Sequence, residues 1–231
     1  MLDRPADLAY DPPAPRPRDI LFEDEFLIAV NKPSGLLSVP GREAHLQDCA
    51  EARAKAHDRN ARTVHRLDMD TSGLLLFGKG AAAHRQLSLL FQRRAVEKRY
   101  LAWVAGGPLE EDGEIDLPLM VDWPNRPLQK IDLENGKPAL TRWRVLDRRD
   151  NASLLALNPE TGRTHQLRLH CAAIGHPILG DRFYADAENR RRAARLQLHA
   201  ERLEFIHPFT AEKMTLAAPH DLAGPMVKKA A

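Results

Sequence analysis

The stretch HRLDMDTSGLLLF spans residues 65–77 and places two carboxylates, a histidine and an arginine directly before an apolar run. The consecutive apolar residues at 74–77 predict a short buried strand. Polar groups beside such a strand need partners, because an unpaired polar group is costly to bury. Two interpretations of the turn stay open from these residues alone. Either Asp68 caps the turn and pairs with Arg66, or Asp68 is a catalytic carboxylate.

The segments on either side of this stretch predict a sheet with few helices. Residues 20–22 and 26–30 read as a β-hairpin, and residues 46–57 as a surface helix. Further along, the pattern predicts helices at 81–94 and 163–174, and strands at 98–105, 115–121, 130–133, 139–146, 154–157, 197–206 and 213–217. Because most strands follow one another directly, we expect an α+β fold with a mixed, largely antiparallel β-sheet flanked by helices.

The composition is that of a globular protein, with 231 residues, 43% hydrophobic residues and a formal net charge of +2. No run of about 18 apolar residues occurs, so we expect no membrane span, no export and a cytoplasmic location. The sequence lacks the motifs of phosphate-binding loops, serine hydrolases, zincins and dinucleotide-binding folds. Cys49 and Cys171 lie in no disulfide or zinc pattern, and we expect both to be reduced thiols.

A second polar window, RTHQLRLH, covers residues 163–170. On the predicted helix, Arg168 and His165 lie three positions apart and therefore share a face. An arginine placed there can keep a nearby carboxylate ionised by stabilising its charged form. The alternative is a surface arginine that binds phosphate or solvent. A metal site of His165, His170 and Cys171 has less support, because their spacing distributes them around the helix and no fourth ligand is evident.

The two windows resemble the RluA family of pseudouridine synthases, whose hallmark is HRLD followed by a Thr-Ser-Gly turn and an apolar strand. The resemblance extends from about residue 20 to residue 217 and includes further motifs in the family's order. These motifs are NKPSGL at 31–36, KRYLA at 98–102, RTHQLRLH at 163–170, GHPILGD at 175–181 and LHA at 198–200. The resemblance implies the pseudouridine synthase catalytic fold and an isomerisation that needs no cofactor and no metal.

The resemblance also implies how the chain is organised. Prolines at 5, 12, 13, 15 and 17 oppose helix and strand, so residues 1–18 are expected to form a flexible arm. Residues 19–222 are expected to form the catalytic domain, and residues 223–231 a flexible tail. Many family members carry an N-terminal S4-type RNA-binding domain, but about twenty residues precede the first predicted strand here, so we expect no S4 domain.

The resemblance implies a catalytic group made of Asp68, Tyr100 and Arg168. Asp68 matches the ionised carboxylate, which attacks C1′ or the base, or removes the C2′ proton to form a glycal. Tyr100 matches a tyrosine that stacks on the uracil and helps to remove the C5 proton, although its pattern alone suggests a core residue. Arg168 matches the arginine that pairs with the aspartate.

The resemblance implies a second group that binds RNA and flips the target base, made of His65, Arg66 and Arg163. A base inside a stacked loop must be turned out of the stack before it can react. Arg66 is expected to enter the space that the flipped base leaves, the alternative being pairing with Asp68 or Asp70. Arg163 is expected to meet phosphate. We assign Asp70 no role.

The expected substrates are stem-loops of RNA. The nearest members of the family act on a uridine in a 23S rRNA stem-loop and on the first nucleotide of the anticodon loop in some tRNAs, so we expect both partners, no required protein partner and a monomer. A synthase confined to tRNA is the alternative within the family. Outside it stand a non-catalytic RNA-binding or ribosome-assembly module and a nucleoside hydrolase that releases free uracil. The bulk charge, 34 Lys and Arg against 32 Asp and Glu, does not separate these readings.

Overall fold

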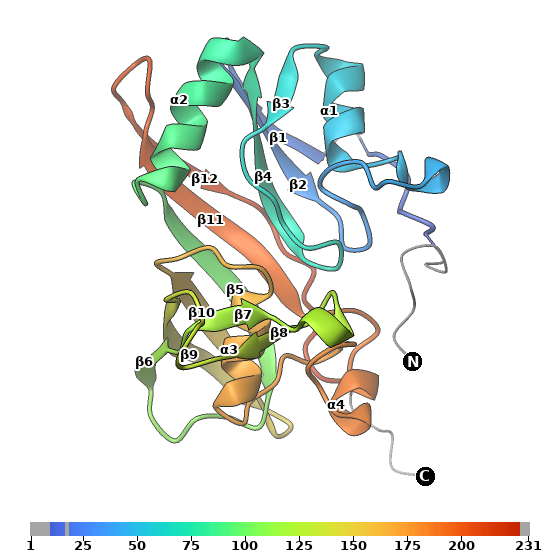
Figure 1. The fold of residues 1–231 in the computed structure, drawn as a ribbon, viewed down its shortest axis with the longest axis vertical. Helices are drawn as coiled ribbons and strands as arrows, with labels where there is room; N and C mark the ends of the chain where they lie inside the picture. The colour runs from blue at the N-terminus through green and yellow to red at the C-terminus, as the bar shows by residue number, and fades with distance from the viewer. Residues whose placement is uncertain (1–9, 17–18, 227–231) are drawn as a thin grey trace. The chain divides into compact units, whose positions relative to one another are not determined.

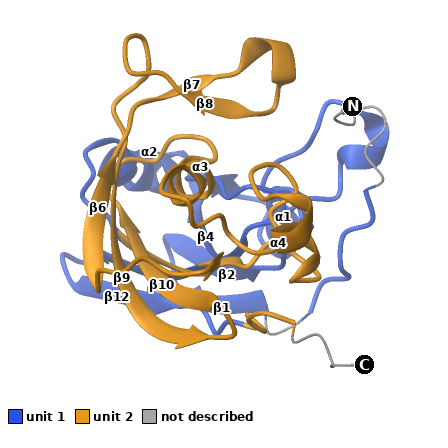
Figure 2. Cartoon of the chain, turned by 90° about the horizontal axis from the view of Figure 1, so that it is seen from below, with its two compact units in different colours: residues 1–97, 200–220 blue, residues 98–199, 221–231 orange. Residues whose placement is uncertain are grey.

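The computed structural model describes residues 10–16 and 19–226, and the chain forms two compact units (Figure 1, Figure 2). The first unit comprises Met1–Glu97 and Ala200–His220, and the second comprises Lys98–His199 and Asp221–Ala231. The predicted arm at 1–18 and tail at 223–231 lie partly outside the described residues. Their described parts, residues 10–16 and 223–226, contain no helix or strand.

The first unit is built on a sheet with the strand order β1-β2-β4-β11, in which β3 pairs with β4 and β12 with β11. Its strands are β1 (Ile20–Glu23), β2 (Leu27–Lys32), β3 (Ala61–Thr63), β4 (Ser72–Lys79), β11 (Leu198–Ile206) and β12 (Lys213–Ala217). The pairs β1–β2, β2–β4, β3–β4 and β11–β12 are antiparallel. Strand β4 is buried along all of its length except Lys79, as the apolar run in the sequence predicts.

Two helices belong to the first unit, α1 (Ala50–His57) and α2 (Gly80–Gln92). Helix α1 begins at Ala50 because Cys49 caps it, its Sγ accepting a hydrogen bond from the Ala52 backbone N–H at 3.3 Å. The predicted start at residue 46 was therefore too early, and residues Ala44–Leu46 form a separate 3-10 turn. Helix α2 buries Ala83 and Leu87, and Leu87 belongs to the core that β4 helps to form.

The second unit is built on an antiparallel sheet with the strand order β5-β10-β9-β6, and β7 and β8 form a separate two-stranded sheet. Its strands are β5 (Glu97–Ala105), β6 (Asp112–Asp116), β7 (Leu119–Val121), β8 (Gln129–Ile131), β9 (Leu140–Arg149) and β10 (Ala152–Pro159). Along β9, the buried Thr141 and Trp143 alternate with the exposed Arg142 and Arg144, which is the period expected of a strand with one covered face.

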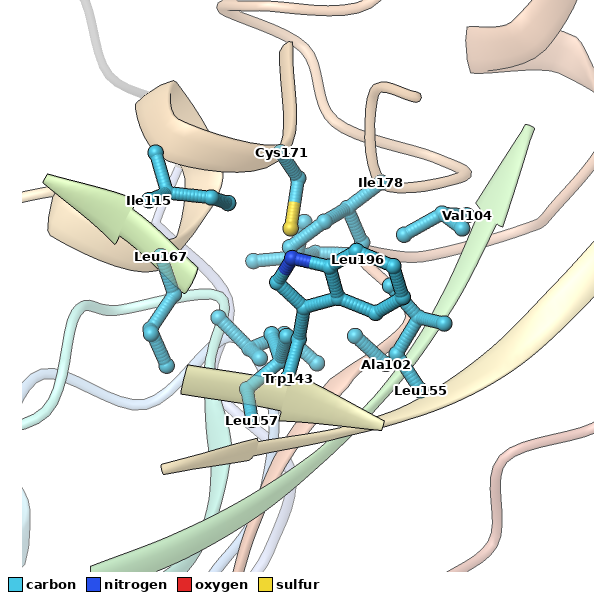
Figure 3. Close-up of a cluster of buried hydrophobic side chains, with 11 residues drawn as sticks. Ala102, Val104, Ile115, Trp143, Leu155, Leu157, Leu167, Cys171, Ile178 and Leu196 are labelled. Carbon is cyan, nitrogen blue, oxygen red and sulfur yellow. The ribbon is translucent and has the colours of Figure 1, made fainter. Parts of the chain in front are cut away.

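The core of the second unit gathers apolar side chains from its strands and from helix α3 (Gln166–Ala173). Figure 3 shows the Cys171 sulfur of α3 directed toward the indole of Trp143. Leu155 and Leu157 of β10 belong to the same fully buried cluster. This packing fixes α3 on the sheet, and α3 carries Arg168.

Helix α3 differs from its prediction in a way that affects the site. It begins at Gln166, because His165 caps it in the left-handed conformation with φ of +54°. Arg163 and His165 therefore lie outside the helix, and the prediction that His165 and Arg168 share a helix face was wrong. The sequence patterns did not predict the three-residue strand β3 or the short helix α4 (Ala187–Arg191).

The observed elements confirm the predicted α+β class with a largely antiparallel sheet. Within the described ranges, no helix is both long enough and apolar enough to cross a membrane. Cys49 and Cys171 are both buried free thiols.

Candidate active site

In the first unit, the HRLD motif forms the connection between β3 and β4. We call residues 65–71 the motif loop. Asp68 is half-buried and follows the buried Leu67. The Thr71 N–H donates to the Asp68 carbonyl at 3.2 Å, which closes a tight turn just before β4 begins. The predicted polar turn before a buried strand is therefore observed, with the carboxylate of Asp68 carried on its first residue.

A buried lysine holds this loop from behind. Lys32, at the end of β2, is 1% exposed, and its ammonium donates hydrogen bonds to the carbonyls of Pro33 at 3.0 Å, Leu36 at 2.7 Å and Met69 at 2.9 Å. An ammonium has three protons, and these bonds use one proton each. Lys32 thus ties its own turn to the residue that follows Asp68. Lys32 belongs to the NKPSGL motif, but nothing in that motif predicts these contacts.

Two serines of the same segment add contacts on both sides of Asp68. The Ser38 hydroxyl donates to the Leu67 carbonyl at 2.7 Å and accepts from the Leu67 N–H at 3.0 Å. The Ser34 hydroxyl donates to the Asp70 carbonyl at 2.7 Å. The backbone of the motif loop is therefore fixed at the residue before Asp68 and at the two residues after it.

His65 contacts the interior of its own unit. Its Nε2 accepts a hydrogen bond from the Leu76 backbone N–H at 3.1 Å, so that nitrogen carries no proton. Its ring stacks on Phe91 with 4.4 Å between the centroids. These contacts tie the start of the motif loop to β4 and α2. The expected role of His65 in RNA binding stays a prediction.

Arg66, by contrast, is exposed and makes no hydrogen bond or ion pair with any residue in the described part of the chain. The alternative in which Arg66 pairs with Asp68 or Asp70 is therefore wrong. An exposed guanidinium on a fixed loop is available to a ligand, which is what the base-flipping expectation requires.

In the second unit, Arg168 forms a buried ion pair with Asp181. Its Nε and Nη2 donate to the two carboxylate oxygens at 2.8 Å and 2.7 Å, and the two side chains are 2% and 0% exposed. The guanidinium also lies over the ring of Phe183, 5.0 Å from its centroid. The alternative of a surface arginine is therefore wrong.

Asp181 is a residue that the sequence analysis missed. Its Oδ1 also accepts the Phe183 N–H at 2.8 Å, so the carboxylate is fixed by the backbone as well as by Arg168. The available signal was the acid at the end of the GHPILGD motif, but nothing in the sequence connects that acid to Arg168.

Tyr100 and Arg163 are half-buried in the second unit. Tyr100 lies on β5 opposite Leu157 of β10 and packs against the buried cluster of this unit. The Arg163 guanidinium donates through Nε to the Pro138 carbonyl at 3.2 Å, just ahead of α3. The expected roles of both residues toward RNA stay predictions.

The alternative of a metal site at His165, His170 and Cys171 finds no support. His170 is buried and uses both ring nitrogens, toward the Thr141 hydroxyl at 2.9 Å and the Leu117 carbonyl at 3.0 Å. Burial lowers the pKa of His170 and raises the pKa of the Cys171 thiol to about 12, so the thiol keeps its proton. Among the residues that the structure describes, no three His, Cys, Asp or Glu side chains gather as metal ligands would.

The first unit therefore brings His65, Arg66 and Asp68 together on one loop, and the second unit holds Tyr100, Arg163 and Arg168 around α3 and β5. A half-buried carboxylate on a rigid turn can act as a nucleophile or a base, and an exposed arginine two residues before it can bind an anion.

Comparisons with known proteins agree with this chemistry. The family model described as RNA pseudouridylate synthase matches residues 26–173. The chain is 49% identical over 213 residues to the dual-specificity RNA pseudouridine synthase RluA of Escherichia coli, with 92% of this chain and 97% of that protein covered. It is 50% identical over 214 residues to the protein of the same name from Salmonella typhimurium, again covering 92% of this chain and 97% of the relative.

Solved structures of RNA pseudouridylate synthase domains also resemble this chain, at lower sequence identity. Human RNA pseudouridylate synthase domain containing 1 superposes with a TM-score of 0.74 at 30% identity, covering 90% of this chain and 86% of that one. Human RNA pseudouridylate synthase domain containing 4 superposes with a TM-score of 0.71 at 26% identity, covering 87% of this chain and 88% of that one. The α+β architecture is thus that of these synthase domains.

Proposed function

Because this chain belongs to the RNA pseudouridylate synthase family, we propose that it isomerises uridine to pseudouridine in RNA. The observation that carries the proposal is the intact HRLD motif on a loop whose backbone is held on both sides of Asp68. Catalysis by a single carboxylate requires that the group be presented at a fixed place. The motif loop meets that requirement.

The reaction conserves every atom of the substrate. The bond between N1 and C1′ breaks, the uracil rotates, and a new bond forms between C5 and C1′, while the proton lost from C5 is balanced by the proton gained at N1. No electrons leave the substrate and no group is donated to it. Asp68 is the proposed carboxylate, acting by attack on C1′ or the base, or by removal of the C2′ proton.

The remaining residues have supporting roles in the proposal. Arg66 fills the place of the flipped uridine, which its exposed and uncommitted guanidinium supports. Tyr100 stacks on the uracil, and Arg168 stabilises the ionised form of Asp68. Arg163 meets a phosphate, and His65 belongs with Arg66 and Arg163 to the group that binds RNA and flips the base.

The proposed substrates are a 23S rRNA stem-loop and the anticodon loop of some tRNAs. The support is the name of the relatives, dual-specificity RNA pseudouridine synthase, at 49% and 50% identity over almost their whole length. Two small hairpins can present one loop shape to an enzyme that recognises shape and flipped bases. The proposal includes a monomer that acts in the cytoplasm and requires no protein partner.

The test is to map pseudouridine in total RNA from a strain that lacks the gene, complemented with wild type, Asp68→Asn or Asp70→Asn. Wild type and Asp70→Asn are expected to restore one rRNA site and anticodon-loop tRNA sites, and Asp68→Asn none. Purified Asp68→Asn should still bind the stem-loops, and wild type should release no free uracil. Restoration of every site by Asp68→Asn would support the non-catalytic reading instead. Restoration of tRNA sites alone would confine the enzyme to tRNA.

A further inference from the structure

A pocket of about 600 Å³ opens in the first unit beside Arg66. Helix α1, the turn after it, β3 and the motif loop all contribute to its lining. Seven of the eleven lining residues are charged or histidine, whereas pockets for small ligands are lined mainly by apolar side chains. The lining includes four cations, Lys55, Arg59, Arg62 and Arg66, and one carboxylate, Glu51.

The positive charge of this pocket is not neutralised from within the unit. Glu51 is engaged by Lys55 at 2.5 Å, in an i,i+4 pair on α1. The side chains of Arg59, Arg62 and Arg66 make no ion pair or hydrogen bond with any residue in the described ranges. Nearby cations behave differently, since Arg53 makes two hydrogen bonds to Asp48, at 2.8 Å and 2.7 Å.

The acid nearest to Arg59 in the sequence is also committed elsewhere. Asp58 accepts the Asn60 N–H at 2.8 Å and lies 3.4 Å from the ammonium of Lys79. The pocket therefore presents three uncompensated guanidinium groups along one connected stretch of chain. Such a field attracts a polyanion, and planar guanidinium groups suit phosphate oxygens in particular.

The backbone that carries these arginines is rigid. Arg62 lies in the middle of β3, paired in register with Gly78 of β4, and Val64 donates to the Leu76 carbonyl at 3.2 Å. Arg62 is exposed, while Ala61 before it is buried. Side chains held on a paired strand lose less freedom on binding than those of a loose loop.

We propose that this pocket binds the sugar-phosphate backbone of the substrate RNA on one side of the flipped uridine. The inference rests on the proposed function, because Arg66 connects the pocket to the nucleotide that is flipped. RNA that places a uridine at Asp68 must pass Arg66, and the chain that follows it runs along Arg62 and Arg59.

The test measures binding of a stem-loop RNA to the full chain at several salt concentrations. Arg59→Ala combined with Arg62→Ala is expected to weaken binding about tenfold near physiological salt. The dependence of log K on log salt should become shallower by about 0.7 for each lost contact with single-stranded RNA. The RNA concentration that gives half-maximal rate should rise in parallel, with a much smaller change in the rate at saturation. Replacement of both arginines by lysine should restore most of the salt dependence.

Lys213→Ala is the matched control, because it removes one positive charge from β12, where Lys213 pairs with Glu204 at 3.1 Å. It should leave affinity and salt dependence at the wild-type values. Equal affinity and equal salt dependence in the double alanine variant and in wild type would overturn the proposal, as would an effect of the same size from Lys213→Ala. A wild-type protein that binds RNA through the pocket but forms no pseudouridine would refute the proposed function and leave this inference standing.

Discussion

A buried cation makes the holding contacts in each unit, Lys32 at the motif loop of the first and Arg168 in the second, but the two cations bind different partners. Lys32 donates to three backbone carbonyls, one of which belongs to the residue after Asp68. Arg168 donates to the side-chain carboxylate of Asp181. The first arrangement fixes a stretch of main chain whatever its side chains are, and the second fixes one side chain through another.

This difference predicts how the two regions respond to amino-acid substitutions. Removing Lys32 takes the ammonium donor from the carbonyls of Pro33 and Leu36, whereas the Met69 carbonyl keeps the Gly35 N–H at 2.9 Å. No second substitution can remove a carbonyl. Removing Asp181 takes away the carboxylate that Arg168 binds through two nitrogens, and a second substitution can then replace the buried guanidinium as well. The second region should therefore be open to rescue by a paired substitution, and the first should not.

The largest expected effect is that of Asp181→Ala. It leaves Arg168 buried and without this carboxylate, which typically costs about 3–5 kcal/mol of the free energy of unfolding. Urea denaturation followed by circular dichroism measures the loss. A cost below about 1 kcal/mol would show that the pair is not buried in solution.

The control for that variant replaces both partners, Asp181→Leu with Arg168→Met. Apolar residues of similar volume in place of a buried pair are often neutral or stabilising, so part of the lost stability should return. The rest stays lost, because the Phe183 N–H no longer has its carboxylate acceptor. Pseudouridine formation should not return, because the proposed role of Arg168 needs its charge. A double variant as unstable as Asp181→Ala would contradict the comparison.

Lys32→Met should have the next largest effect. The carbonyls of Pro33 and Leu36 lose their lysine donor, and unsatisfied groups of this kind cost about 1–3 kcal/mol each, so we expect a loss of about 2–3 kcal/mol after relaxation. The rate of pseudouridine formation should fall at least about tenfold, since a misplaced catalytic group is costly in rate. Urea denaturation and single-turnover kinetics test the two parts.

Lys79→Met is the matched control for Lys32→Met. Lys79 is a lysine of the same unit that pairs with Glu23 at 2.8 Å, donates to a single carbonyl, that of Asp24, at 2.9 Å, and is 18% exposed. Its loss should cost less than about 1 kcal/mol, as for most accessible ion pairs. An equal cost for the two lysines would mean that the carbonyl contacts of Lys32 add nothing.

In these two regions, some features could be predicted from the sequence and others could not. The apolar run after the HRLD motif predicts β4 because a buried strand leaves a continuous hydrophobic signal. The contacts of Lys32 leave no such signal, because a hydrogen bond to a main-chain carbonyl requires no particular residue at the position that accepts it. The sequence therefore does not distinguish a buried lysine that binds main-chain carbonyls from a lysine exposed on the surface.

The ion pair of the second region could not be predicted, for a different reason. Arg168 and Asp181 are brought together by the turn after α3, and pattern periodicity describes only residues on one element. The start of α3 was also misplaced, because His165 adopts a left-handed conformation with φ of +54° that glycine or asparagine more commonly signals. The sequence predicted which residues belong to the site, but it did not predict the hydrogen bonds and the ion pair that hold them in place.

Ser38→Ala tests the backbone contacts that hold the motif loop just before Asp68. The Ser38 hydroxyl is buried and makes two hydrogen bonds to Leu67, so its loss should cost about 1–2 kcal/mol. Ser34→Ala removes a single bond to the Asp70 carbonyl at a partly buried position and should cost about half as much. Thermal or urea unfolding of the two variants ranks them, and the reverse order would contradict the proposed hold on Asp68 from the residue before it.

The smallest expected effect is a pH dependence in the second unit that the first unit should not share. Burial lowers the pKa of His170 below its ordinary value, so the unfolded chain takes up this proton before the folded chain does. Stability is then complete above about pH 6.5 and falls as the pH drops toward the folded pKa, by at most about 1.4 kcal/mol per pH unit. Urea denaturation between about pH 7 and 5 should show this slope in wild type and lose it in His170→Asn. His45→Asn, at an exposed histidine of the first unit, should keep the slope, and a slope that survives in His170→Asn would place its origin elsewhere.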